Sequence, residues 1–128
     1  ASPEPKYPMD TCRPKPPLPS RPLIGAEEAQ RLGVLFKSLA HPTRLRLLHA
    51  LIRAGELNVS DLAGEVGMTA QAVSNQLQRL AEISVVSSRR DGLQVIYRVV
   101  DSCVPVLLQR GWCHIEDYDE VATAVVGR

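Results

Sequence analysis

The sequence predicts a mainly α-helical domain that carries one small β-hairpin. Of its 128 residues 45% are hydrophobic but only 4% are aromatic, so Leu, Val, Ala and Ile must build the core, which suits small helices. From residue 26 onward, apolar residues recur at helical spacing. One Asp-Gly pair, the strongest short hairpin signal, lies between two β-branched runs. These observations favour an α+β fold in a single domain.

A proline-rich arm precedes this domain. Eight of the ten prolines lie between Pro3 and Pro22, a density that forbids helix and disfavours sheet. We therefore expect an extended arm (1–25), a main domain (26–113) and an acidic helical tail (114–128). The arm is either a disordered tail or a segment that docks on a partner subunit and presents Cys12.

Two helices open the main domain. The first begins at Ala26, and its apolar stripe consists of Leu32, Leu35, Phe36 and Leu39. Pro42 interrupts it because proline restrains the preceding residue, and a second helix begins there because proline is favoured in a first turn. Gly55 is well placed as the C-cap of this second helix.

Two further helices follow, separated by a tight turn. The third opens near Val59 with Ser60 as its expected N-cap, and Gly67 ends it. Thr69 then caps the fourth helix. The inward-facing positions of this helix are Val73, Leu77 and Leu80.

A hairpin and one or two helices complete the chain. We expect a strand over 85–88, a turn at 89–92 and a return strand over 95–100. Asp101 and Ser102 can cap a further helix, which Gly111 is expected to break before a last helical piece at about 116–126.

A helix, a tight turn that contains glycine and a second helix with a polar face together form the helix-turn-helix arrangement. In this arrangement the second helix enters the major groove of DNA. Gln and Asn amides donate and accept in one plane, as base edges require. The hairpin would be a wing that reaches the DNA backbone or minor groove. The candidate DNA contacts are Thr69, Gln71, Ser74, Asn75, Gln76 and Arg79 on the helix, and Arg89 and Arg90 on the hairpin. The alternative reading of the polar helix is a solvated face.

Several other classes of protein are disfavoured. The chain shows neither a catalytic Ser/His/Asp or Cys/His grouping nor a phosphate-binding glycine loop, so we expect no enzyme. Apolar runs fall short of the ~20 residues that cross a bilayer. Three cysteines are too few for a disulfide framework, which predicts a cytoplasmic protein with reduced thiols.

Several segments resemble the ArsR/SmtB family of repressors. Phe36–Leu48 resembles the family's opening signature, Val59–Ala63 with Val73–Leu77 its helix-turn-helix, and Arg90–Gly92 with Val95–Tyr97 its wing. The match covers about residues 26–113. The resemblance implies a winged-helix repressor that binds operator DNA as a homodimer, formed through the first and post-wing helices. It also implies that binding of an inducer ion releases this dimer from the DNA. The family commonly has glycine where Ser84 stands.

The resemblance also directs attention to two sensor sites. The family's cysteine site near Val59 is absent, because Asn58 and Ser60 stand there. A second family site lies on the post-wing helix and begins Asp-x-His, which Asp101 to Cys103 matches with cysteine in place of histidine. We expect the ion ligands to be Cys12, Cys103 and Cys113, with His114, Asp101 and Asp117 as second choices.

Thiolate ligands select soft ions. The expected inducer is therefore arsenite, cadmium, lead or mercury, whereas histidine and carboxylate ligands would suit zinc. Three alternatives remain open: the cysteines are small buried residues, they form a disulfide in a redox-controlled repressor, or the domain docks proteins instead of DNA.

Overall fold

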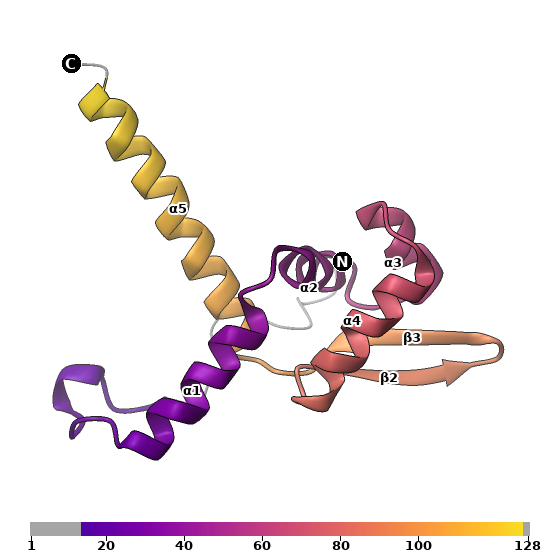
Figure 1. The fold of residues 1–128 in the computed structure, drawn as a ribbon, viewed down its shortest axis with the longest axis horizontal. Helices are drawn as coiled ribbons and strands as arrows, with labels where there is room; N and C mark the ends of the chain where they lie inside the picture. Colours follow the sequence, from indigo (N-terminus) through magenta and orange to yellow (C-terminus); the bar gives the residue numbers. More distant parts are fainter. Residues whose placement is uncertain (1–13, 127–128) are drawn as a thin grey trace, which may run out of the picture.

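The computed structural model describes residues 14–126 and confirms a mainly α-helical winged helix-turn-helix domain (Figure 1). The helices are α1 (Ala26–Leu39), α2 (Pro42–Ala54), α3 (Val59–Val66), α4 (Ala70–Glu82) and α5 (Val104–Val126), with a short 3-10 helix η1 (Leu18–Ser20) before them. The strands are β1 (Leu57–Asn58), β2 (Val86–Asp91) and β3 (Gln94–Val99). Figure 1 shows α4 beside the β2–β3 hairpin, while α1 and α5 extend away from these elements.

The sequence predicted an extended arm, but the described part of the arm contains a short helical turn. Residues Leu18–Ser20 form a 3-10 turn in which the N–H and Oγ of Ser20 donate to the carbonyl oxygen of Pro17 at 3.0 and 2.9 Å. A proline is tolerated there because the first residues of a helical turn need no backbone donor. Cys12 lies outside the described residues.

Most predicted helix ends are confirmed. Gly55 (φ 87°) ends α2 and Gly67 (φ 68°) ends α3, both with positive φ that glycine adopts without strain. Thr69 caps α4, since its Oγ1 accepts from the N–H of Ala72 at 3.2 Å. The expected cap at Ser60 is wrong: Asn58 caps α3, and its Oδ1 accepts from the N–H of Asp61 at 2.6 Å.

The three strands form one antiparallel sheet in the order β1-β3-β2, with Leu57 opposite Tyr97 and Val86 opposite Val99. The expected turn over 89–92 is wrong, because pairing continues to Asp91 opposite Gln94. Only Gly92 (φ 64°) and Leu93 remain as a two-residue loop, in which glycine supplies the positive φ of the first central position.

The expected break in the last helix is also wrong. α5 runs continuously from Val104 to Val126 through Gly111, because one glycine weakens a helix by only about 1 kcal/mol. Asp101 starts this helix, since its Oδ1 accepts from the N–H groups of Cys103 at 2.7 Å and Val104 at 3.3 Å. None of the described helices is long and apolar enough to cross a membrane.

The core joins α2, α3, α4 and the sheet. Its fully buried side chains are Leu47, Leu48, Leu51, Leu62, Leu77, Leu80, Val73, Val85, Val99 and Val104. Leu and Val dominate this set, as the low aromatic content predicted. Because α4 is anchored through Val73, Leu77 and Leu80, its opposite face is held outward in a fixed orientation.

Candidate functional site

The exposed face of α4 is a polar stripe. Gln71, Asn75 and Arg79 are exposed and four residues apart, so they lie along one side of the helix. The Nε2 of Gln71 donates to the Oδ1 of Asn75 at 3.0 Å. Helix α4 itself packs against α3 and β2. The structure therefore presents these amides outward on a rigid helix, the placement that reading of a major groove requires.

Two other candidates on α4, Ser74 and Gln76, are half-buried. Gln76 is held from inside the molecule, because the Nε of Arg44 donates to its Oε1 at 2.8 Å. Arg44 also donates from Nη1 to the carbonyl oxygen of Ser38 at 2.8 Å. Sequence reasoning missed Arg44, which lies inside the segment Phe36–Leu48 that carries the resemblance but shows no sign of its distant partner.

The two hairpin arginines point in different directions. Arg89 and Arg90 are neighbours in β2, and successive strand residues face opposite sides of a sheet. Arg89 forms a bidentate pair with Glu56, with 2.6 Å from Nη1 to Oε2 and 3.0 Å from Nη2 to Oε1. This hydrogen bonding raises the pKa of the Arg89 guanidinium. Arg90 is exposed, and the hairpin tip itself is Gly92 and Leu93.

Two of the cysteines lie at the post-wing helix α5. Cys103 is exposed just before α5. Cys113 is half-buried within α5, and its Sγ donates to the Oδ2 of Asp117 at 3.7 Å. His114, a second-choice ligand, follows Cys113 in the sequence and is exposed. Asp101, another second-choice ligand, uses one carboxylate oxygen to cap the helix. The structure thus pairs Cys113 with Asp117, while Cys103 lies ten residues earlier, next to the N-terminus of α5.

The separation of Cys103 and Cys113 limits what one protomer can do. Ten residues of helix span about 15 Å, whereas the Cα atoms of a disulfide lie within about 7 Å. A disulfide between these two residues of one chain therefore gains no support. The described residues contain no group of three or more His, Cys, Asp and Glu that could hold a metal ion.

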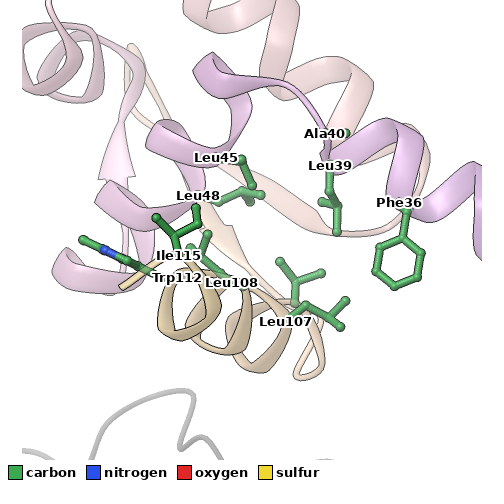
Figure 2. Close-up of a pocket in the computed structure, with 11 residues that line it drawn as sticks. Phe36, Leu39, Ala40, Leu45, Leu48, Leu107, Leu108, Trp112 and Ile115 are labelled. Atoms are coloured by element: carbon green, nitrogen blue, oxygen red, sulfur yellow. The ribbon is translucent and has the colours of Figure 1, made fainter. Parts of the chain in front are cut away.

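An apolar groove lies between α1, α2 and α5 (Figure 2). Its volume is about 550 Å³, and Figure 2 shows Phe36 of α1, Leu45 of α2 and Leu107 of α5 among the side chains that line it. Trp112 borders the groove, is 50% exposed, and packs edge-on against His49 with ring centroids 5.1 Å apart.

Comparison with known proteins identifies the relatives of this fold. A family model described as a helix-turn-helix domain matches residues 39–89. The transcriptional repressor SmtB homolog of Synechocystis is 37% identical over 97 residues, which are 76% of this chain and 73% of that protein. The crystal structure of the AntR antimony-specific transcriptional repressor is 53% identical, with a TM-score of 0.75 over 85% of this chain and 98% of that one.

The chain belongs to the ArsR/SmtB family.

A second solved structure agrees with this assignment. The homodimeric winged helix-turn-helix DNA-binding domain of Mb0332 from Mycobacterium bovis is 28% identical, with a TM-score of 0.64 over 76% of this chain and 92% of that one. The family assignment confirms the resemblance inferred from Phe36–Leu48 and the helix-turn-helix segments. ArsR/SmtB proteins are winged helix-turn-helix repressors that bind operator DNA as homodimers, so this chain is a DNA-binding transcriptional regulator and not an enzyme.

Family membership leaves the individual contacts as predictions. The eight candidate DNA contacts lie on α4, on its N-cap and on β2, which are the elements that such repressors present to DNA.

Proposed function

We propose that this ArsR/SmtB protein is a repressor that leaves its operator when a thiophilic metal or metalloid ion binds cysteines of two protomers. The observation that carries the proposal is the placement of Cys103 and Cys113. Cys103 lies directly before α5 and Cys113 lies within it, so in one protomer the two residues are about 15 Å apart. Cys103 and Cys113 of the same chain therefore cannot bind one ion.

The groove supplies the dimer surface in this proposal. Phe36, Trp112 and Ile115 are 47%, 50% and 57% exposed, although each has a large apolar side chain. Apolar side chains that cluster on the surface usually mark an interaction site. A second copy of the chain, with its own α1 packed against these residues, would remove them from water and fix the two α4 helices relative to each other.

Twofold symmetry accounts for the spacing of the cysteines. In a symmetric dimer, when residue i meets residue j of the other chain, j also meets i. In an antiparallel pair of α5 helices centred on residue 108, midway between the cysteines, Cys103 lies level with Cys113 of the partner subunit. At 3.6 residues per turn both cysteines lie about 140° around the helix from Leu108, so in this proposal the two α5 helices meet on the side opposite Leu108, which lines the groove. Two equivalent ion sites result, and Cys12 of either arm can complete each one. Asp101, His114 and Asp117 remain the second-choice ligands.

The chemistry of the donors selects the ion. Thiolate sulfur prefers soft ions, and three sulfur ligands suit the trigonal geometry of trivalent arsenic or antimony. The similarity to the antimony-specific AntR favours this metalloid class over cadmium, lead, mercury or zinc. Reduced thiols are needed for such a site, in agreement with the expected cytoplasmic location.

Release of DNA follows from coupling between the two sites. The ion lowers the affinity for DNA only as far as it binds one arrangement of the dimer more tightly than the other. A coupling free energy of about 1–3 kcal/mol changes operator affinity about 5- to 150-fold. Because α5 contributes to both the groove and the cysteine pair, a shift at the ion site changes the separation of the two α4 helices.

The test is a titration of a protein–DNA complex with a metalloid. DNA selected from a randomised duplex pool by the wild-type protein is labelled, and dissociation is followed by fluorescence anisotropy as antimonyl tartrate, arsenite or zinc chloride is added. We expect the trivalent metalloids to release wild-type protein. Cys103→Ser and Cys113→Ser should each bind DNA normally but resist release, and Cys12→Ser measures the contribution of the arm.

Mixed dimers provide the sharper experiment. Co-expression of Cys103→Ser with Cys113→Ser chains carrying different tags yields a heterodimer that keeps one complete Cys103–Cys113 pair across the interface. We expect this heterodimer to bind one metalloid ion, whereas each homodimeric variant binds none. Equal ion content in all of these dimers would overturn a site shared between protomers.

A further inference from the structure

Arg44 connects the end of one helix to the polar face of another. Its Nη1 donates to the carbonyl oxygen of Ser38 at 2.8 Å, in the last turn of α1, where helical carbonyls lack partners within their own helix. Its Nε donates to the Oε1 of Gln76 on α4 at 2.8 Å. Both contacts are partly buried, so the guanidinium is fixed from two sides.

This contact fixes which end of the Gln76 amide faces outward. A guanidinium carries five N–H donors and no acceptor, so only the oxygen of the amide can face it. Turning the amide by 180° would place two N–H groups against a cation and lose a hydrogen bond to a charged group. The nitrogen Nε2 of Gln76, with its two donors, is therefore the end that points away from Arg44.

The neighbouring amides are not restricted in this way. Gln71 donates to Asn75 at 3.0 Å, but each amide has a donor and an acceptor, and the pair can reverse direction together. These side chains can adapt to different base edges. Gln76 differs because its partner is a cation that can only donate.

Base edges in the major groove respond to this difference. Adenine offers one acceptor and one donor, so a glutamine that reads it needs both ends of its amide. Guanine offers two adjacent acceptors, N7 and O6, which suit an amide that presents only donors. We infer that Arg44 is a specificity-determining positioning residue, which commits Gln76 to guanine rather than adenine. The inference rests on the proposed function, because it requires α4 to lie in the major groove.

Arg46 provides a matched control on the same helix. Its Nη1 donates to the carbonyl oxygen of Val66 at 3.2 Å, at the end of α3, just as Arg44 donates to the end of α1. Arg46 therefore has a comparable structural contact to a helix end without a contact to a DNA-facing amide. Loss of either arginine removes one charge and one helix-end contact.

The experiment is selection of binding sites from randomised duplex DNA by the full-length wild type, Gln76→Ala, Arg44→Leu and Arg46→Leu. We expect the wild type to prefer guanine over adenine by roughly 5- to 150-fold at one base pair of each half-site. Gln76→Ala should lose the preference at that base pair alone. Arg44→Leu should accept adenine there, while Arg46→Leu should keep the wild-type preference even if its overall affinity falls.

The outcomes separate the inference from the proposed function. A wild type that selects no sequence overturns both. A wild type that selects a sequence overturns the inference alone if its Gln76-dependent base is adenine, if Gln76→Ala changes no position, or if Arg44→Leu binds more weakly with an unchanged preference. Should Arg44→Leu fail to fold, 7-deazaguanine at that base pair tests the wild type: binding that is not weakened at least fivefold overturns the inference.

Discussion

The backbone N–H of Val85 donates to the carbonyl oxygen of Leu80 at 3.0 Å and closes the C-terminus of α4. Between these two residues in the sequence, the N–H of Ser84 donates to the carbonyl oxygen of Ala81 at 3.0 Å. The two bonds form a Schellman motif, whose left-handed position is usually glycine. Ser84 occupies that position with φ 61°, and Leu80 and Val85 are both fully buried.

Replacement of Ser84 by glycine should stabilise the protein. The left-handed conformation costs a side-chain-bearing residue about 1 kcal/mol, which glycine avoids. We expect Ser84→Gly to raise the free energy of unfolding by roughly that amount, measured by urea denaturation at fixed protein concentration. Ser88→Gly, in a strand, should lower stability, and a stabilisation of equal size in both variants would contradict the explanation.

The N-cap of α4 should contribute measurably to stability. Thr69→Ala removes the acceptor for the N–H of Ala72, which should cost about 1 kcal/mol. Thr69→Ser keeps a hydroxyl at the same position and should retain most of that stability. Urea denaturation of the three proteins compares them directly, and equal losses in both variants would show that the methyl group, not the cap, matters.

Neutralisation of Glu56 should change how the wing responds to DNA. Glu56→Gln weakens the pair that holds Arg89 on the sheet, so the guanidinium becomes available to a phosphate. Each new phosphate contact steepens the slope of log K against log salt by about 0.9. We expect a steeper slope for Glu56→Gln than for Glu65→Gln, which removes the same charge from an exposed position on α3. Equal slopes in anisotropy titrations would show that Arg89 stays away from DNA.

Trp112 should be an anchor of the dimer. Its half-exposed ring borders the apolar groove between α1 and α5, and central aromatic side chains often contribute 2 kcal/mol or more to an interface. We expect Trp112→Ala to weaken dimerisation by roughly 30-fold, measured by sedimentation velocity. Leu93→Ala removes an even more exposed apolar side chain at the hairpin tip and should leave the dimer intact.

Local signals predicted most of the fold. Gly55, Gly67 and Thr69 end or begin helices where the sequence placed them, because a cap or a positive φ depends on a few neighbouring residues. The errors lie in the arm at Leu18–Ser20, at Ser60, at the hairpin turn and at Gly111. Asn58 offers a cap two residues before Ser60, strand pairing continues to Asp91 opposite Gln94, and the cost of one glycine is too small to end α5 at Gly111.

The sequence by itself determined the helix-turn-helix, the hairpin and the family, since apolar periodicity and capping residues are encoded within short segments. Only the tertiary structure decided that Arg44 holds Gln76, 32 positions away, and that Arg89 is paired with Glu56. It also decided that an unbroken helix separates Cys113 from Cys103, which lies directly before that helix. The physical reason is that these relationships depend on how whole elements pack. The spacing of residues along the chain does not show which distant elements pack together.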